Sequence, residues 1–273
     1  MAEQIWDSFA RLNAGERFKA QSAEMGAAVT EAIVAACEVG EGMRVLDVAC
    51  GAGEPSISIA ALMKGTGKVV GVDMAGAPLD VARERARKRG LENVEYRQGD
   101  VHTLEFEDGS FDRISSRLGV MFFGDLPKAL GEMRRVLKPR GRVALLAWGG
   151  MEQPYFDTTV GTVLRMRPGL EIPATARLMF KFGKPGTLGA ALKESGLSEI
   201  GEETQKLKWD WHGSPEEMWD YFRGVTVPFR GLLEKVDGDA EVDGAVLAAL
   251  RERFDGEWVR LEAEMVVATG VKG

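Results

Sequence analysis

Hydrophobic and polar positions change their spacing several times along the chain, and each change predicts a different kind of element. Between residues 43 and 148, short apolar runs alternate with stretches whose apolar residues recur at helical spacing. The apolar runs predict strands and the periodic stretches predict helices. This alternation favours parallel strands joined by right-handed crossovers, which is a doubly wound α/β sheet. The expected strands are 44–49, 68–73, 94–98, 111–116 and 142–148, and the expected helices are 55–63, 78–89 and 126–137.

The flanking segments show other patterns. Residues 4–40 carry apolar side chains at helical spacing, which predicts two helices before the sheet. Residues 149–186 mix apolar residues with frequent glycine and proline, which favours an irregular cover segment. Residues 213–262 form a long insertion with helix starts at Ser214 and near Asp243. We expect the cover segment and the insertion to form a lid over the substrate.

Three more elements are expected to complete the sheet domain: a helix at 187–195, a strand at 201–211 and a closing strand at 264–269. The pattern therefore predicts a seven-stranded, mostly parallel, Rossmann-like sheet with N-terminal helices and a helical lid inserted late in the chain. The expected organisation is a helical cap at 1–40, the Rossmann-like core at 41–148, the cover at 149–186, a core helix and sixth strand at 187–212, the lid at 213–262 and the final strand at 263–273.

Composition narrows the class of protein and its partners. The length of 273 residues suits one α/β domain with an added lid. The formal charge of -7 argues against a nucleic-acid partner, because neutralising phosphates requires a basic surface. No apolar run approaches the length of a membrane span, and the N-terminus lacks the pattern of a signal peptide. We expect a protein of the cytoplasm; nothing in the sequence indicates its oligomeric state.

The two cysteines add to this picture. Cys50 lies in a glycine-containing turn and Cys37 lies in an alanine-rich helical segment. Neither a disulfide framework nor a metal-ligand spacing is present, which favours a reducing compartment and predicts no metal site.

The strand and turn at 45–54 are the most informative motif in the chain. An apolar strand runs into a turn with glycines at 51 and 53, and a helix is expected from about Pro55. The next strand ends in an acid, Asp73, twenty residues after Gly53. Glycines permit a tight turn, and an acid at this spacing can accept both hydroxyls of a ribose. The motif predicts a nucleoside-binding site.

The charges around the turn favour one nucleoside over another. Asp47 stands at the carboxyl end of the first strand and Glu54 opens the helix. Two carboxylates would repel the pyrophosphate of a dinucleotide, which normally sits at this helix N-terminus. S-adenosylmethionine (SAM) has no phosphate and carries a cationic amino group and a sulfonium, which carboxylates attract. The charge pattern therefore favours SAM.

The segment Asp47-Val-Ala-Cys-Gly-Ala-Gly53 resembles the first motif of class I SAM-dependent methyltransferases, and this variant is similar to the ubiquinone and menaquinone biosynthesis C-methyltransferase group. Gln98-Gly-Asp-Val101, 111–117 and 137–148 resemble later motifs of the family in the same order, although the family usually has glycine where Arg140 stands. The resemblance covers about residues 40–150. It implies that the last two strands form an antiparallel hairpin at the sheet edge.

The resemblance also implies roles for individual residues. Asp73 would bind the ribose, Met74 would pack on the adenine and Asp100 would meet the adenine amino group. Arg117 could reach a cofactor carboxylate, an anionic substrate or a surface acid. The expected SAM-binding residues are Asp47, Ala49, Gly51, Gly53, Asp73, Met74, Asp100, Val101 and Arg117.

Candidates for the acceptor side come from the cover and lid segments, where aromatic residues concentrate. A methyl acceptor needs a dry, mostly apolar pocket. His212, between Trp209 and Trp211, is the candidate general base, whereas His102 is expected to be packed or solvent-facing. Trp6 could close the site from the other side. The expected substrate-binding residues are Trp148, Tyr155, Trp211 and Trp219.

These observations predict an SN2 transfer of a methyl group from SAM to a carbon, oxygen, nitrogen or sulfur atom of a small molecule. Two alternatives remain at this stage. One is an NAD-dependent oxidoreductase built on the same strand–turn–helix unit, and the other is a catalytically silent scaffold that binds SAM. Fold alone does not identify the acceptor, because many unrelated acceptors share this cofactor half.

Overall fold

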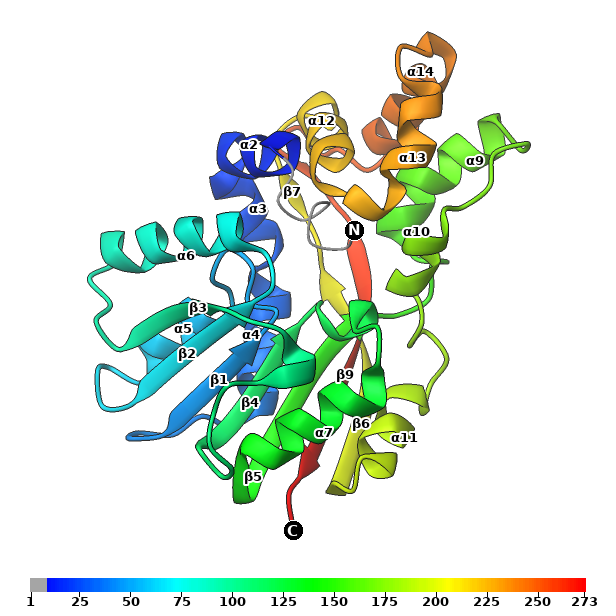
Figure 1. Cartoon of the computed structure of the whole chain (residues 1–273). Coiled ribbons are helices and arrows are strands. Elements are labelled where there is room, and N and C mark those ends of the chain that lie inside the picture. Colours follow the sequence, from blue (N-terminus) through cyan, green and yellow to red (C-terminus); the bar gives the residue numbers. More distant parts are fainter. Residues whose placement is uncertain (1–8) are drawn as a thin grey trace. The chain divides into compact units, whose positions relative to one another are not determined.

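The computed structural model describes residues 9–273 (Figure 1). The predicted role of Trp6 lies outside the described residues. The chain divides into two compact units. We call them the core unit, made of Val29–Ala147, Lys184–Gln205 and Met265–Gly273, and the helical unit, made of the residues up to Ala28, Trp148–Gly183 and Lys206–Glu264.

The sheet has seven strands in the order β3-β2-β1-β4-β5-β9-β6. The first five strands pair in parallel, which confirms the doubly wound α/β sheet. β9 lies between β5 and β6, so the last two strands are neighbours at one edge. The strands are β1 (Arg44–Val48), β2 (Lys68–Asp73), β3 (Val94–Gln98), β4 (Phe111–Arg117), β5 (Leu137–Trp148), β6 (Ser198–Lys208) and β9 (Glu262–Val271).

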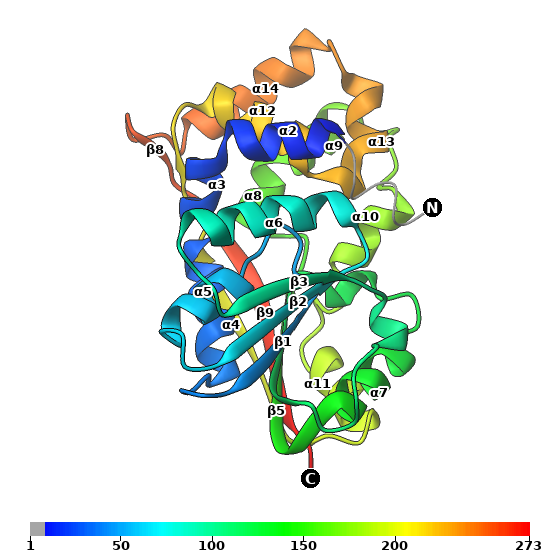
Figure 2. The ribbon, with the colours of Figure 1, turned by 60° about the vertical axis from the view of Figure 1, so that its left-hand side comes forward.

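Helices cover both faces of the sheet in the core unit. Figure 2 shows α4 and α5 on one face and α7 and α11 on the other. The expected helices at 55–63, 78–89, 126–137 and 187–195 are confirmed with small shifts at their ends. The helices of this unit are α4 (Ala27–Cys37, whose first two residues belong to the helical unit), α5 (Ser56–Leu62), α6 (Gly76–Lys88), α7 (Leu126–Val136) and α11 (Thr187–Glu194). Two short 3-10 turns accompany them, η1 (Val101–Thr103) and η2 (Val120–Phe122).

The strand at the centre of this arrangement is apolar because it is covered on both faces. In β1, Val45 and Leu46 are fully buried. Val45 packs with Ile59, Ala60 and Met63 of the α5 region. Strands buried on both faces read as continuous apolar runs, which is why β1 was visible in the sequence. The registers Asp47–Gly71, Asp47–Ser115 and Asp73–Gln98 bring the carboxyl ends of four strands to one edge.

The helical unit contains short helices and a small second sheet in which β7 pairs antiparallel with β8. α12 contacts α2, and α14 contacts α9 and α12. Its elements are α2 (Phe9–Arg17), α3 (Lys19–Met25), α8 (Pro154–Phe156), the π-helix η3 (Asp157–Gly161), α9 (Thr162–Met166), α10 (Ala174–Met179), β7 (Trp211–His212), α12 (Pro215–Val225), η4 (Val227–Phe229), α13 (Arg230–Leu233), η5 (Glu234–Val236), α14 (Ala240–Arg251) and β8 (Trp258–Val259).

The expectation of an irregular cover at 149–186 is wrong for much of that segment. α8, η3 and α9 follow one another without a break from Pro154 to Met166. Pro154 stands in the first turn, where the missing N–H costs nothing. The Thr159 hydroxyl donates to the Tyr155 carbonyl at 2.7 Å and the Thr162 hydroxyl donates to the Thr158 carbonyl at 3.0 Å. The proline and glycine residues therefore led to the wrong prediction of an irregular segment here.

Two further boundaries differ from expectation. The strand expected at 201–211 ends at Lys208, and Trp211 belongs to β7 in the second sheet. The Asp210 carboxylate accepts from the Leu261 amide at 2.9 Å, and this bond holds the bend between β6 and β7. The helix start expected near Asp243 lies earlier, because the Asp239 side chain caps α14 through the Val242 amide. The start at Ser214 is confirmed by a capping box with Glu217.

The N-terminal region also differs in detail. Sequence periodicity predicted two helices over 4–40, whereas three, α2, α3 and α4, occupy the described part of that range. They are separated at Phe18 and Gly26, and the chain remains helical or turn-like at both points. Breaks this short leave the apolar spacing nearly intact, so periodicity does not detect them.

Candidate functional site

The turn after β1 has an unusual backbone. Ala49, Gly51 and Gly53 have φ angles of 57°, 51° and 106°. The Cys50 amide donates to the Val72 carbonyl at 3.1 Å, and the Gly53 amide donates to the Cys50 carbonyl at 2.9 Å. The turn is thus tied to the end of β2 and closed on itself. Left-handed conformations favour glycine, which explains two of the three residues.

The two glycines of the turn face different surroundings. A Cβ atom added at Gly53 would lie 2.7 Å from Cδ1 of Ile57 and 3.1 Å from the Tyr96 hydroxyl. A Cβ atom added at Gly51 would meet no atom within 4 Å. Gly53 therefore permits the close packing of the turn on α5 and β3, whereas Gly51 borders open space.

Asp73, at the tip of β2, is held by backbone amides. Its Oδ2 accepts from the Gly51 amide at 2.8 Å, and its Oδ1 accepts from the Ala75 amide at 2.9 Å. Each oxygen is thus fixed by a backbone donor, and a carboxylate can accept about four hydrogen bonds in all. Met74 follows directly and is 40% exposed. The structure thus brings Asp73, Met74 and Gly51 together at the predicted place.

Asp47 is fully buried, and its carboxyl group does not face solvent. One oxygen accepts from the Ser56 amide and hydroxyl at 3.1 and 2.5 Å, and the other accepts from the Ser115 hydroxyl at 2.9 Å. Burial raises the pKa of Asp47 from 3.8 to about 7, although the bonds from Ser56 and Ser115 lower it. Asp47 therefore joins β1 to α5 and β4.

Glu54 is also engaged within the protein. Its Oε2 accepts from the Ser58 hydroxyl at 2.7 Å, and its Oε1 lies 3.3 Å from the Arg89 guanidinium. From the sequence, the preference of the turn for a positively charged ligand was attributed to Asp47 and Glu54. In the structure one of these acids is buried with a raised pKa and the other is paired with an arginine, so neither is a free charge. Asp73 is half-buried and bonded to backbone amides, and the Asp100 side chain is 51% exposed and bonded to His102.

Asp100 follows β3 and caps the short turn η1. Its Oδ1 accepts from the His102 amide at 2.9 Å and contacts Nδ1 of the same histidine at 2.6 Å. Burial raises the pKa of Asp100, but the bonds from His102 outweigh that effect and lower it overall. Val101 is 8% exposed and anchors the turn. Asp100 is therefore an ionised acceptor at the end of the strand beside β2.

The end of β4 approaches the turn from the other side. A Cβ atom added at Gly119 would lie 2.5 Å from Cβ of Ala49, so only glycine allows this approach. Leu118 has a φ of 59°. Arg117, the last residue of β4, pairs in register with Leu146 of β5 and has a half-buried side chain.

The predicted acceptor residues all lie in the helical unit, where they are buried. Trp148 stacks on Tyr155 with ring centroids 5.8 Å apart, and both are less than 10% exposed. Trp211 is fully buried against Phe18 and Tyr221. Trp219 donates through its indole nitrogen to Asp243 at 2.7 Å. Trp148 and Tyr155 thus form one aromatic cluster, while Trp211 lies in another.

His212 lies on the surface of the helical unit with a side chain that is 46% exposed. Its ring stacks on Trp258 with centroids 4.3 Å apart. Nδ1 lies 3.2 Å from a Glu24 oxygen and Nε2 lies 3.5 Å from a Glu257 oxygen. Both ring nitrogens are therefore engaged by carboxylates, and accepting a proton from a substrate would require one contact to break.

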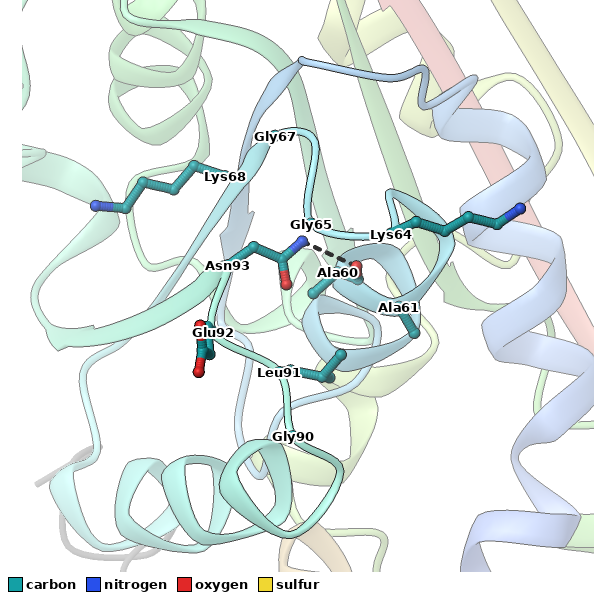
Figure 3. A pocket seen from close by; sticks show the side chains of 10 residues that line it. All are labelled: Ala60, Ala61, Lys64, Gly65, Gly67, Lys68, Gly90, Leu91, Glu92 and Asn93. Atoms are coloured by element: carbon teal, nitrogen blue, oxygen red, sulfur yellow. Dashed lines mark hydrogen bonds between the residues drawn. The ribbon is translucent and has the colours of Figure 1, made fainter.

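A hollow of about 590 Å³ lies at the opposite ends of β2 and β3 from the turn (Figure 3). Its lining includes Lys64, Lys68 and Asn93, and the Asn93 amide donates to the Ala60 carbonyl at 2.9 Å. Because ligands of doubly wound sheets bind at the carboxyl ends of the strands, this hollow is separate from the candidate cofactor site.

Two other features are absent from residues 9–273. No helix in this range is long and apolar enough to cross a membrane. No group of three or more histidine, cysteine, aspartate or glutamate side chains in the same range is arranged to hold a metal ion.

Sequence reasoning missed the partners that hold the acids in place. Ser56 and Ser115 were not singled out, although Asp47 depends on both. His102 was expected to be only packed or exposed, yet it bonds to Asp100. A serine in the first helical turn after a strand-end acid is a usable signal for the first pair. The Ser115 contact depends on strand order, which local sequence does not contain.

Comparisons with known proteins relate this chain to methyltransferases. A family model described as a methyltransferase domain matches residues 40–153. An uncharacterized protein of Mycobacterium tuberculosis is 30% identical over 235 residues, which cover 85% of this chain and 78% of that protein. The demethylmenaquinone methyltransferase of Staphylococcus aureus is 39% identical over 118 residues, which cover 43% of this chain and 48% of that enzyme.

Among solved structures, a SAM-dependent methyltransferase from Aquifex aeolicus has a similar fold. The TM-score is 0.54 at 22% identity, and the match covers 70% of this chain and 92% of that chain. At this level of identity the likeness concerns the fold alone. The family match ends near the start of the cover segment, so the sequence region that it includes is the cofactor half.

Proposed function

This chain belongs to the class I SAM-dependent methyltransferases, in the group similar to the ubiquinone and menaquinone biosynthesis methyltransferases, and from this premise we propose that it methylates a small molecule. Family membership decides among the three interpretations of the sequence. The chain is an enzyme, its cofactor is SAM, and the NAD-dependent oxidoreductase and the silent scaffold are set aside.

The observation that carries the proposed cofactor contacts is the alignment of Asp73 and Asp100. Asp73 ends β2 and Asp100 follows the adjacent parallel strand β3, and the register pairs Asp73 with Gln98, two residues before Asp100. Amides of Gly51 and Ala75 hold the Asp73 carboxylate, and His102 holds Asp100. Two fixed acceptors at one sheet edge suit a nucleoside, with Asp73 toward the ribose hydroxyls and Asp100 toward the adenine amino group.

The remaining cofactor-binding residues follow from the same edge. Gly51 borders open space, so a ligand can approach the backbone there. Met74 offers an exposed apolar surface beside Asp73 on which adenine can pack. Asp47 is buried, so we propose that it acts by holding the turn through Ser56 and not by contact with SAM. Ala49, Gly53, Val101 and Arg117 complete the proposed set.

SAM supplies a methyl group that is already activated because it is bonded to a positively charged sulfur. The protein's contribution is therefore mainly to hold donor and acceptor in line and to exclude water. Positioning can supply roughly 7 to 11 kcal/mol, whereas a general base typically supplies about 3 to 5 kcal/mol. His212 remains the candidate base, but the proposed reaction does not depend on one.

The nature of the acceptor is the open part of the proposal. Aromatic side chains of the helical unit, Trp148, Tyr155, Trp211 and Trp219, are proposed to shape an apolar acceptor site. Because they are buried, we propose that they act by forming its wall. The similarity to a demethylmenaquinone methyltransferase makes a reduced quinone one candidate. The proposal covers carbon, oxygen, nitrogen and sulfur acceptors.

A turnover screen tests the proposal. The full chain is incubated with SAM and a panel of quinols, phenols, amines and thiols, and mass spectrometry follows S-adenosylhomocysteine and the methylated product together. We expect one class to give both products in equal amounts. Binding of SAM without turnover of any class would contradict the assignment of a small acceptor of these kinds, while leaving the family unaffected.

A further inference from the structure

His102 lies near the cofactor edge, and its ring is bonded to two separate segments of the chain. Nδ1 contacts Oδ1 of Asp100 at 2.6 Å, and Nε2 accepts from the backbone amide of Asp125 at 3.2 Å. The Asp125 side chain in turn caps α7 by accepting from the Lys128 amide. The imidazole therefore links the turn that carries Asp100 to the start of α7.

These contacts determine where the proton of the neutral ring lies. The Asp125 amide can only donate, so Nε2 must present its lone pair. In a neutral imidazole the other nitrogen then carries the hydrogen, and Nδ1 donates to Asp100. The neutral Nδ1–H tautomer satisfies both neighbours at once. The contact of Nε2 with the Asp125 amide thus selects the tautomer in which Nδ1 can donate to Asp100.

The consequence for Asp100 concerns its two oxygens. Oδ1 receives both the His102 amide and the His102 ring. Within residues 9–273, Oδ2 has no hydrogen-bond donor, and the Asp100 side chain is 51% exposed. The histidine therefore fixes the rotation of the carboxylate and leaves one oxygen for an external donor.

The rest of the turn is fastened to the same helix. The Leu104 amide donates to Glu132 at 2.8 Å, and the Arg135 guanidinium donates to the Leu104 carbonyl at 2.7 Å. With the backbone held at Leu104, the remaining freedom of this turn is chiefly that of the Asp100 side chain. His102 restricts the rotation of the Asp100 side chain.

We propose that His102 is a positioning residue that orients Asp100 to accept from the 6-amino group of the purine, and that it thereby sets the preference for an adenine cofactor over its deaminated form. This rests on the proposed role of Asp100. A purine with a 6-oxo group would present an acceptor to the carboxylate in place of a donor, so a correctly oriented Asp100 rejects it.

Calorimetry with S-adenosylhomocysteine and S-inosylhomocysteine measures this preference on the full chain. The variants His102→Asn and His102→Gln are matched, because the asparagine amide can replace Nδ1 and the glutamine amide can replace Nε2. We expect the wild type to prefer the adenine ligand by about tenfold to 100-fold. His102→Asn should stay within about threefold of that preference, and His102→Gln should lose roughly tenfold of it.

An unchanged preference in His102→Gln, or equal losses in both variants, would overturn the inference while leaving the cofactor assignment intact. Failure of the wild type to bind S-adenosylhomocysteine would instead contradict the proposed function, and this inference with it. Nitrogen NMR of the wild-type ring gives a second test that needs no variant to fold. The neutral ring should carry its hydrogen on Nδ1, and a hydrogen on Nε2 would overturn the inference.

Discussion

Gly51 and Gly53 are two residues apart in the cofactor turn, but their replacement by alanine should chiefly affect different properties, SAM affinity at Gly51 and stability at Gly53. At Gly53 an added Cβ atom would lie 2.7 Å from Cδ1 of Ile57, closer than real Cβ contacts, and 3.1 Å from the Tyr96 hydroxyl, closer than most of them. Gly53→Ala should therefore lower the free energy of unfolding by about 1 to 3 kcal/mol or more. Urea unfolding monitored by tryptophan fluorescence measures this loss.

At Gly51 the methyl group meets no protein atom, so Gly51→Ala should cost only the strain of a left-handed alanine, on the order of 1 kcal/mol. Its methyl group would occupy the space through which SAM approaches the turn. We expect SAM affinity, measured by calorimetry, to fall by about tenfold or more while the fold survives. Full SAM affinity in Gly51→Ala would place the cofactor elsewhere.

Asp47 makes folding stability depend on pH in a direction opposite to that of most acids. Burial raises the pKa of this carboxyl from 3.8 to about 7, so the folded chain keeps a proton that the unfolded chain loses between these values. Its contribution to the free energy of unfolding is present below about pH 4 and is lost as the pH rises toward 7.

The variant Asp47→Asn cannot ionise and can still accept from Ser56. Between about pH 5 and pH 8, the free energy of unfolding of the wild type should fall by about 2 to 3 kcal/mol relative to Asp47→Asn. Because the other titrating groups are common to both proteins, the difference between the two urea curves isolates this carboxyl. Parallel pH profiles would show that Asp47 is ionised throughout this range.

The irregular first part of β5 explains why the family usually has glycine where this chain has Arg140. Arg140 has a φ of 61°, and its amide donates to the Lys272 carbonyl at 2.7 Å. The pairing of β4 with β5 shifts register in this region, between Phe111 and Arg113. This irregular start of the strand sets the backbone conformation, so Arg140 adopts a positive φ despite the strain.

Arg140→Gly should therefore be neutral or raise the free energy of unfolding by up to about 1 kcal/mol, because relief of strain exceeds the added freedom of the unfolded chain. Arg140→Val should lower it by more than about 1 kcal/mol, since a branched side chain fits a positive φ poorly. Thermal and urea unfolding of the two variants compare them. A more stable Arg140→Val would contradict the backbone interpretation.

Elements were predictable from the sequence where their pattern reflects burial. The run Val45–Val48 and the acid Asp73 identify β1 and β2, because both strands are covered on two faces and end at the ligand edge. The helices at 154–166 were not predictable in the same way. They include threonine hydroxyls that bond to preceding carbonyls, an arrangement that tends to bend helices, and they contain Gly161, so the local pattern did not favour a helix.

In the molecule taken as a whole, the two units differ in how much the sequence revealed. The core unit contains most of the family match and the nucleoside-binding pattern, so the cofactor could be predicted. The helical unit draws its residues from three separate parts of the chain, and its packing arises from contacts between them. Local patterns do not encode such contacts, which is why its aromatic residues were identified but their burial was not.

SAM affinity of Asp73→Ala decides whether the cofactor edge has been assigned correctly. The wild type, Asp73→Ala and the control Asp80→Ala, an exposed acid of α6, are titrated with SAM by calorimetry under the same conditions. Loss of the ribose acceptor should weaken binding by about 1.5 to 3 kcal/mol, or roughly tenfold to 150-fold, in Asp73→Ala alone. Equal affinity in all three proteins would contradict the assignment of Asp73 and of the site built around it.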